Sequence, residues 1–502
     1  MNQRNAAYLV GLDQGTTSTR ALLITDKGEV VKNVSQPVAC KFPQPGWVEQ
    51  DADAIFESAR TCLNEAMAGL NAAQVAGIGI TNQRETLVLW ERDTLRALGP
   101  AIVWQCRRSE SICDLWRKQG WADDVRKRTG LPLDPYFSAS KLAWRLDQAP
   151  ELRRRAEAGE IAFGTVDAWL IACFTQGRLH LTDASNASRT LLYDLDVGGW
   201  SRELCEAFKI PMQILPEVRD SFGDFGSVQA ADGNGVISIR AVLGDQQAAL
   251  FGQAALQSGQ AKYTLGTGGF LVVNTGENRR SSKALAESGL LETVAWQHQG
   301  QKTFAIEGSV FSAGAAVQWL RDELGFFSNS SEIEDLAASV PDSGGVVLVP
   351  AFTGLGAPHW DAAARGSLFG LTRGTSRAHL ARATLEALAL QCREVIQAAN
   401  DLTGEPLRFL SIDGGATKNH LLIQILADIV QIPVIRPDFS EVTALGAALA
   451  AGVGAGLYAT LGEAGSVLRL ASRHVPDTSF DPSPTVARFA KAVAACRRFS
   501  AT

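Results

Sequence analysis

Three short turns rich in glycine and hydroxyl side chains could bind phosphate groups. They occupy Gly15–Ser18, Gly266–Gly269 and Gly414–Asn419, and each closely follows an apolar run. Such turns present backbone N–H groups without bulky side chains in the way, which is the arrangement that phosphate oxygens require. A single Gly-Thr-Thr turn is more often an ordinary hairpin, so the prediction of a phosphate site depends on the presence of several such turns.

Two carboxylates adjoin the predicted turns. Asp13 ends the apolar run that leads into the first turn, and Asp245 lies between an apolar run and an apolar helix start. Asp13 is well placed to hold a metal through water, because Mg²⁺ gives up its hydration shell reluctantly. Asp245 could orient an attacking hydroxyl and accept its proton in a phosphotransferase; alternatively, it is a helix N-cap. Arg20, shortly after the first turn, could offset the remaining charge.

A second set of residues could bind a polyol. Arg84 and Glu85 are adjacent, and such a pair can hold neighbouring hydroxyls, because one residue donates hydrogen bonds and the other accepts them. The aromatic rings of Trp104 and Tyr136 could cover a carbon chain. The alternative for this set is a surface ion pair together with aromatic residues of the core.

The secondary-structure pattern must bring these residues together. The first half begins with a strand, a small-residue turn and a strand from Tyr8 to Thr25, and the second half repeats this device from Ala261 to Asn274. Helical spacing covers Asp53–Leu70, and the alternation of strands and helices favours an α/β fold. The repetition predicts two duplicated α/β domains that face a cleft, residues 1–253 and 254–502.

Composition bounds the class of protein. The 502 residues carry a formal net charge of −6, which disfavours a nucleic-acid-binding protein that works through a broad basic face. The eight cysteines are scattered and the six histidines lack metal-ligand spacing, which indicates reduced thiols in a cytoplasmic protein and no protein-held zinc. The apolar run near the amino terminus is too short for a signal peptide. Val442–Leu461 is uncharged but rich in Ala and Gly, so we expect a buried helix and no membrane insertion.

Several longer motifs resemble those of a known enzyme family. They are Asp13-Gln-Gly-Thr-Thr-Ser-Thr-Arg20, Gly79-Ile-Thr-Asn-Gln-Arg-Glu-Thr86, Trp104-Gln-Cys-Arg-Arg108, Gly164-Thr-Val-Asp167, Thr182-Asp-Ala-Ser-Asn-Ala-Ser-Arg-Thr190, Gly244-Asp-Gln-Gln247 and Asp413-Gly-Gly415. From about Tyr8 to the small-residue helix beyond Glu441, the chain resembles the glycerol kinases, a branch of the FGGY carbohydrate kinases in the superfamily of actin, hexokinase and heat-shock protein 70. The resemblance implies an α/β fold with two actin-like (ribonuclease H-like) domains that flank a nucleotide and substrate cleft.

The resemblance also implies a role for each matching residue. Asp245 would be the catalytic base, and Asp13 would lie near Mg²⁺. Glycerol would be bound by Arg84, Glu85, Trp104, Tyr136, Asp245, Gln246 and Phe270. ATP would be bound by Thr16, Thr17, Ser18, Arg20, Thr267, Gly268, Gly314, Gln318, Gly415 and Asn419. The implied reaction is attack of a terminal glycerol hydroxyl on the γ-phosphorus of MgATP, which yields sn-glycerol 3-phosphate and ADP, in a homo-oligomer (dimer or tetramer).

The chain departs from the family pattern at two turns. Gly269 stands where many members carry Cys, and Gly233–Val236 lacks the basic loop through which some bacterial members are inhibited by a phosphorylated sugar. Two other functions stay open: a kinase for another polyol or a ketose, and a nucleotide-gated chaperone, filament or regulatory protein of the same fold. The Arg84–Glu85 pair argues against the first, and the complete catalytic set argues against the second.

Overall fold

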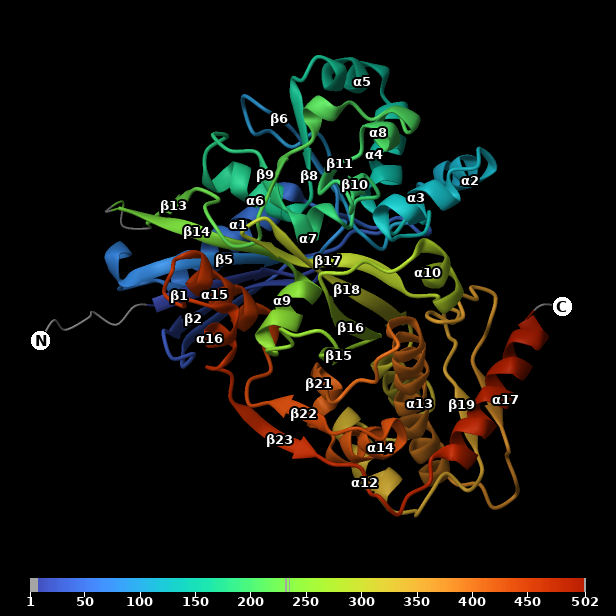
Figure 1. Ribbon diagram of the computed structural model, residues 1–502. Helices are drawn as coiled ribbons and strands as arrows, with labels where there is room; N and C mark the ends of the chain where they lie inside the picture. Colours follow the sequence, from blue (N-terminus) through green and yellow to red (C-terminus); the bar gives the residue numbers. More distant parts are fainter. Residues whose placement is uncertain (1–7, 231–232, 234, 501–502) are drawn as a thin grey trace, which may run out of the picture.

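Two mixed β-sheets with helices packed on them build the frame of the molecule (Figure 1). The computed structural model describes residues 8–230, 233 and 235–500. Residue 234, within the loop Gly233–Val236 singled out above, therefore lies outside the described residues. The first half of the chain forms one sheet and an inserted region, and the second half forms the other sheet. The predicted α/β class is confirmed.

The first sheet combines an antiparallel meander with two parallel strands. In spatial order it contains β13 (Ser227–Gln229), β14 (Val236–Gly244), β5 (Val75–Asn82), β1 (Tyr8–Gln14), β2 (Ser18–Thr25) and β3 (Val30–Pro37). β1, β2 and β3 pair antiparallel, whereas β5 and β14 run parallel to β1. The hairpin predicted from Tyr8 to Thr25 is thus part of this sheet.

The second sheet repeats this plan. In spatial order it contains β17 (Leu291–His298), β18 (Gln301–Val310), β16 (Gly269–Gly276), β15 (Ala261–Leu265), β21 (Leu410–Asp413), β22 (Val434–Pro437) and β23 (Leu470–His474). β15, β16 and β18 pair antiparallel, although β17 comes between β16 and β18 in the chain, and β21 and β22 run parallel to β15. The duplication predicted from the paired turns therefore extends to the order and direction of five strands in each sheet.

Helices from both halves cover the sheets. α1 (Ala52–Ala66) and α6 (Val166–Phe174) contact the first sheet, and α15 (Val442–Gly454) packs along its parallel strands. α13 (Arg377–Thr403) packs on the second sheet, α14 (His420–Val430) packs against α13, and α9 (Asp245–Gly252) lies between the two sheets (Figure 1). The second half also contains α10 (Ser282–Ser288), α11 (Gly314–Asp322), α12 (Ile333–Ala338), α16 (Leu461–Gly465), α17 (Ser483–Ser500), β19 (Val347–Val349) and β20 (Ser367–Phe369).

The inserted region between β5 and β13 has a hydrophobic core of its own, to which Ile102, Phe137 and Leu192 belong. Its strands are β6 (Val88–Glu91), β7 (Ala101–Ile102), β8 (Ile161–Gly164), β9 (Leu181–Asp183), β10 (Tyr193–Asp194), β11 (Gly199–Trp200) and β12 (Glu217–Arg219), and β4 (Glu49–Gln50) pairs with β7. Its helices are α2 (Glu110–Lys118), α3 (Ala122–Thr129), α4 (Ser138–Asp147), α5 (Pro150–Glu157), α7 (Ala184–Ala187) and α8 (Arg202–Ala207).

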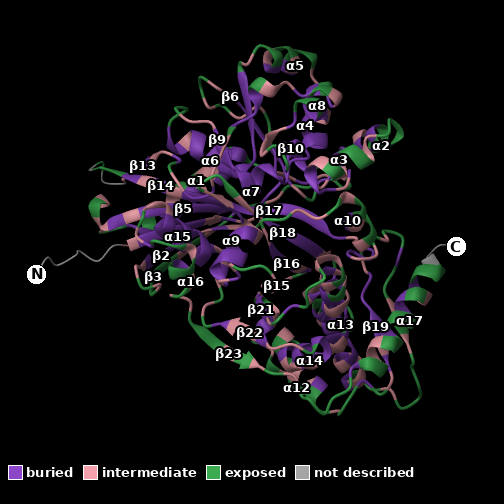
Figure 2. Cartoon of the chain, viewed as in Figure 1, coloured by how far each residue is buried: buried purple, intermediate pink, exposed green. Residues whose placement is uncertain are grey.

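α15 joins the two halves of the chain. It comes from the second half but packs beside β1 and β5 of the first sheet (Figure 1). Gly11 and Gly79 permit this approach, because a Cβ on either would lie 1.9 Å from the backbone oxygen of Ala444 or Ala447. The helix is buried along its length, as expected for this small-residue segment (Figure 2). Within the described residues, no helix is long and apolar enough to cross a membrane.

Candidate active site

The ends of three neighbouring strands bring the predicted residues of the first half together. The carboxyl ends of β1, β5 and β14 lie together, because Asn82 at the end of β5 is in register with Gln14 of β1 and Gly244 of β14, the two strands that flank it. Asp13 precedes Gln14 and so lies at the same end of the first sheet. The chain leaves β5 and β14 at this end. Arg84 and Asp245, which follow these strands, therefore come within contact of each other although they are far apart in the sequence.

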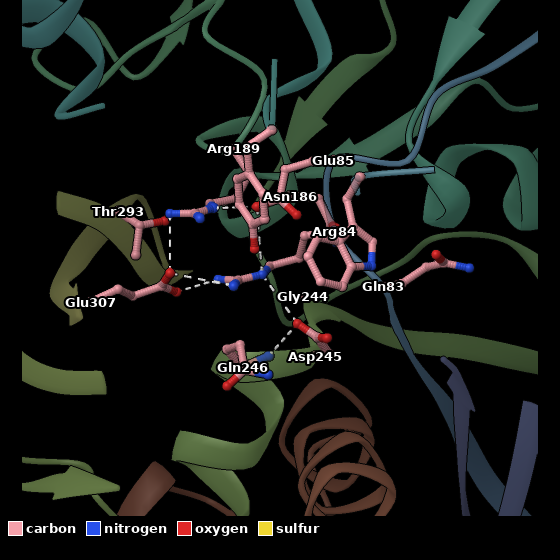
Figure 3. A network of polar contacts seen from close by, with 12 residues as sticks. Gln83, Arg84, Glu85, Asn186, Arg189, Gly244, Asp245, Gln246, Thr293 and Glu307 are labelled. Atoms are coloured by element: carbon pink, nitrogen blue, oxygen red, sulfur yellow. Dashed lines mark hydrogen bonds and ion pairs between the residues drawn. The ribbon is translucent and has the colours of Figure 1, made fainter. Parts of the chain in front are cut away.

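Arg84 is the centre of a buried ion network (Figure 3). Its Nε lies 3.1 Å from Asp245 Oδ1 and 3.8 Å from Glu85 Oε1, and its terminal nitrogens donate to Glu307 on β18. Arg189 completes the network, with Nε 2.6 Å from Glu85 Oε1 and Nη1 3.2 Å from Glu307 Oε2. Arg84, Glu85 and Arg189 are at most 3 % exposed. The alternative of a surface ion pair is therefore wrong.

The pKa values within this network separate the roles of its carboxylates. Burial opposes the charge of Arg84, but Glu307, Glu85 and Asp245 together raise the pKa of Arg84 well above its ordinary value. Arg189 and Arg84 overcome the effect of burial at Glu307 and lower its pKa. At Glu85, burial outweighs the two arginines and raises the pKa. Glu307 is thus the more firmly ionised of the two carboxylates.

Glu85 adopts a backbone conformation that side chains rarely allow. Its φ is 61°, in the left-handed region. The backbone N–H of Thr86 donates to Arg84 O at 2.7 Å, and the Ser138 hydroxyl donates to Glu85 O at 3.0 Å. Such strain costs on the order of 1–3 kcal/mol and persists where the surroundings hold it, most often at binding and catalytic sites. The tight turn directs two adjacent side chains into one network.

The motif Thr182–Thr190 supports the ion network from the inserted region. Asn186 and Asn82 exchange side-chain hydrogen bonds at 3.0 and 3.2 Å, and Asp183 accepts from the backbone N–H of Asn186 at 2.9 Å. Arg189 follows in the same motif. Sequence reasoning missed a role for both Arg189 and Glu307. Arg189 lay within a recognised motif, whereas no local pattern marks Glu307, which is 223 positions from its partner Arg84.

Trp104 and Tyr136 form an aromatic wall beside this network. Their ring centroids are 5.3 Å apart in an edge-to-face arrangement. Trp104 Nε1 also donates to Thr16 Oγ1 at 3.0 Å, which links the wall to the first glycine-rich turn. Burial raises the pKa of Tyr136. Phe270 lies on β16, half-buried and next to the second turn.

Asp245 is the first residue of α9 and not its N-cap. The N-cap is Gly244, so the capping interpretation of Asp245 is wrong. Its Oδ1 accepts from the backbone N–H of Gln246 at 2.7 Å and pairs with Arg84. The Asp245 side chain is 31 % exposed, unlike the buried carboxylates around it. It is therefore accessible to a ligand while an arginine holds it in place.

Asp13 and Asp245 form an acidic pair at the strand ends. Burial and the charge of Asp245 raise the pKa of Asp13 to about 7, and Arg20 opposes this shift. Two repelling carboxylates fit a divalent cation, which would relieve both. Within the part of the chain that the structure describes, no group of three or more His, Cys, Asp or Glu side chains could hold a metal by itself. Water and ligand oxygens would have to complete the coordination.

The first turn is closed by a hydrogen bond from Gly15 N to Ser18 O at 2.9 Å. Thr17 is exposed, and its neighbours Thr16 and Ser18 are half-buried, so the turn is accessible. Arg20 is the register partner of Asp13, but its guanidinium pairs with Glu441, the residue just before α15. The second half of the chain therefore holds this predicted phosphate ligand.

The second and third turns line a cavity of about 460 Å³. Five of the predicted nucleotide residues line it: Thr267, Gly314, Gln318, Gly415 and Asn419. Gly268 belongs to the same turn as Thr267. The volume is in the range of small-molecule and cofactor sites. Sequence reasoning missed five polar residues that also line the cavity. Asn329, Ser330, Ser331 and Glu334 carry no motif signal, whereas Lys418 lies within the third turn.

The amino-acid sequence matches models of two protein-family domains. The N-terminal domain model of the FGGY family of carbohydrate kinases matches residues 8–252, and the C-terminal domain model matches residues 261–455. The chain belongs to the FGGY family of carbohydrate kinases. Among FGGY relatives, it is 50 % identical over 496 residues to a glycerol kinase of Aromatoleum aromaticum, covering 98 % of this chain and 99 % of the relative. It is 53 % identical to a glycerol kinase of Thermus brockianus, covering 93 % and 94 % of the two chains.

Solved structures confirm the FGGY fold over nearly the whole chain. Plasmodium falciparum glycerol kinase with ADP superposes with a TM-score of 0.91 at 33 % identity, covering 98 % of both chains. Gluconate kinase from Lactobacillus acidophilus superposes with a TM-score of 0.87 at 22 % identity, which shows a shared fold. The two-domain FGGY architecture predicted from the motifs is thus confirmed.

Proposed function

We propose that this FGGY kinase phosphorylates glycerol, transferring the γ-phosphoryl group of ATP to a terminal hydroxyl to yield sn-glycerol 3-phosphate and ADP. The observation that carries the proposal is the grouping of Arg84, Glu85 and the accessible Asp245 at one sheet edge. The identity of about half of all residues with glycerol kinases over nearly the full length supports it. The nucleotide-sized cavity at the end of β15 supports ATP as the donor.

The polyol would be held by alternating donors and acceptors. Arg84 donates and Glu85 accepts at neighbouring hydroxyls, while Trp104, Tyr136 and Phe270 cover the carbon atoms. Asp245 accepts the proton of the attacking hydroxyl, since its half-exposed carboxylate is the one that a ligand can reach. The contact between Arg84 and Asp245 fixes the orientation of this base.

The phosphates of ATP would be bound by the two small-residue turns. The backbone and hydroxyls of Thr16–Ser18 and of Thr267 with Gly268 supply donors, and Gly314, Gln318, Gly415 and Asn419 surround the nucleoside. Arg20 would add charge if it exchanges Glu441 for a phosphate. Asp13 would hold Mg²⁺ through water, and the ion would neutralise charge on the transferred phosphoryl group. Closure of the cleft would exclude water that otherwise hydrolyses ATP.

An assay of ADP release across glycerol, other small polyols and ketoses tests this function. We expect the highest kcat/KM with glycerol. A higher kcat/KM with another polyol or a ketose would instead support the alternative kinase. Binding of ATP without transfer to any acceptor would support a chaperone, filament or regulatory role and overturn the proposal.

Gly415 gives a test of the nucleotide cavity. A Cβ at this position would have no neighbour within 4 Å, so a larger side chain enters the cavity without disturbing the fold. We expect Gly415→Leu to raise the KM for ATP about tenfold or more, equivalent to roughly 1.4 kcal/mol, while the KM for glycerol and the Tm change little. Gly199→Leu, also in open space but in the inserted region, is the matched control. An unchanged KM for ATP would place the nucleotide elsewhere.

Asp13 gives a test of the metal role. Asp13→Asn removes a half-buried charge that repels Asp245, so the fold should be as stable as the wild type or more so. We expect kcat to fall on the order of 100-fold and the Mg²⁺ concentration needed for half-maximal rate to rise, because a Lewis acid stabilises transition-state charge by several kcal/mol. The measurement is ADP release as a function of Mg²⁺ concentration. Wild-type rates at every Mg²⁺ concentration would contradict the assignment.

Three broader features belong to the same proposal. We take residues 1–253 and 254–502 as the two domains, with α15 crossing to the first sheet, and we propose a cytoplasmic homodimer or homotetramer. The scattered cysteines and the mild acidity support this setting. Light scattering during gel filtration would test the assembly, and a purely monomeric protein would contradict it.

A further inference from the structure

Lys262 on β15 is a buried cation that the mechanism above does not use. Its side chain is 0 % exposed, and its Nζ donates hydrogen bonds to Gln246 Oε1 and, at 2.8 Å, to Thr264 Oγ1. Gln246 lies on α9 next to Asp245 (Figure 3), whereas Lys262 belongs to the second sheet. The contact therefore ties the predicted polyol site to the opposite half of the chain.

The surroundings of Lys262 are arranged for an ammonium ion. Burial lowers its pKa, and three carboxylates offset this effect, those of Asp413, Asp245 and Glu307. Asp413 is itself buried and anchored, since Gln253 Nε2 donates to its Oδ2 at 2.5 Å. A buried ammonium is costly unless it is paired and hydrogen-bonded. Two side-chain oxygens accept hydrogen bonds from Lys262 Nζ, and the three carboxylates favour its charge, so hydrogen bonding and electrostatic attraction both support an ammonium at this position.

The chemistry of an ammonium group decides the orientation of the Gln246 amide. An ammonium only donates hydrogen bonds, so it must face the amide oxygen, and the amide NH₂ is directed the other way. Gln246 is half-buried, and Asp245 beside it is accessible. Gln246, which carries the donor NH₂, thus directly follows Asp245, which carries the acceptor carboxylate, just as Glu85 directly follows Arg84 in the sequence.

We propose that Lys262 is a positioning residue, which holds Gln246 as a hydrogen-bond donor toward an oxygen of the polyol. The inference rests on the proposed function of the site and adds a determinant of its specificity. Without Lys262, the amide can rotate and present its oxygen, which accepts from a hydroxyl but cannot donate to the polyol oxygen. Lys262 acts through Gln246 and does not itself touch the polyol.

Lys262→Met tests the proposal because methionine is of similar length and has no donor. We expect the KM for glycerol to rise about tenfold, the usual scale for loss of one well-placed hydrogen bond, with a smaller fall in kcat and a KM for ATP within about twofold of wild type. Lys302→Met is the matched control. Lys302 is a partly buried lysine on β18 whose Nζ donates to Leu195 O at 2.6 Å, away from the site.

A double-mutant cycle separates this role from a structural one. In a Gln246→Leu background, Lys262→Met should cause no further rise in the KM for glycerol, because its effect passes through Gln246. Additive effects would overturn the proposal. A fall in kcat with an unchanged KM for glycerol would also overturn it and would place the effect of Lys262 on the transfer of the phosphoryl group.

Gln246→Glu keeps the test decisive if Lys262→Met folds poorly. Its carboxylate still pairs with Lys262 but cannot donate to a hydroxyl, so we expect the same rise in KM as for Gln246→Leu. A wild-type KM in Gln246→Glu would refute the donor role. All comparisons use the small polyol that the wild type turns over best. If that polyol is not glycerol, the proposed function fails. The Lys262 inference is then still tested by the ratio of the variant's KM for that polyol to the wild-type KM.

Discussion

Replacing Asp245 by Asn is expected to reduce kcat for glycerol phosphorylation about 10³-fold. The amide is nearly the same size but cannot accept the proton of the attacking hydroxyl, and loss of a positioned general base costs roughly 10²–10⁴ in rate. Asp245 lies at the edge of the first sheet, whereas the nucleotide cavity is built from the second half of the chain. The affinity for ATP should therefore stay within about twofold of wild type.

ADP release under saturating glycerol and calorimetric titration with a non-hydrolysable ATP analogue measure these two effects. Asp124→Asn, an exposed carboxylate in the first turn of α3, is the matched control and should leave both unchanged. Turnover by Asp245→Asn within tenfold of wild type would rule out Asp245 as the base. Loss of ATP binding would show instead that the carboxylate supports the nucleotide site.

Replacing Arg84 by Met is expected to lower both stability and activity. Two buried arginines face Glu85, Glu307 and the half-exposed Asp245. Removal of Arg84 leaves Arg189 to compensate the remaining carboxylates, and breaking a buried ion pair from one side costs about 3–5 kcal/mol. We expect a fall of that size in the free energy of unfolding and a loss of about 100-fold or more in kcat/KM for glycerol.

Urea denaturation followed by fluorescence measures the change in the free energy of unfolding. Arg96→Met is the matched control, since Arg96 pairs with Glu91 while 65 % exposed, and such surface pairs contribute about 1 kcal/mol or less. Arg84→Met with wild-type stability would mean that the carboxylates take up protons at no cost, and the charge balance inferred for the network would be wrong. Unchanged glycerol kinetics in a folded variant would remove Arg84 from the polyol site.

Much of the fold could be predicted because its signals are local. The hairpins around the first two turns and the helix expected over Asp53–Leu70 appear as β1–β2, β15–β16 and α1, shifted by a few residues at their ends. Turn chemistry, apolar alternation and helical spacing are properties of short segments. The duplicated sheet follows from the same pattern occurring twice.

The packing of α15 could not be predicted in the same way. The sequence indicates a buried small-residue helix, and the structure confirms one. Its position on the first sheet depends on Gly11 and Gly79, which lie more than 300 residues before it and leave room for its backbone. Close approach between distant segments has no local signature.

The sequence by itself determined which residues could do chemistry here: the three turns that could bind phosphate, the carboxylates at strand ends, and the adjacent Arg84 and Glu85. These are matters of side-chain type and local spacing. Only the tertiary structure decided the charge states and the orientations of these side chains. Glu307 pairs with Arg84, Glu441 pairs with Arg20, and Lys262 donates to the Gln246 amide oxygen. The physical reason is that pKa values and amide orientation depend on burial and on partners from other elements, which exist only once the two sheets have packed together.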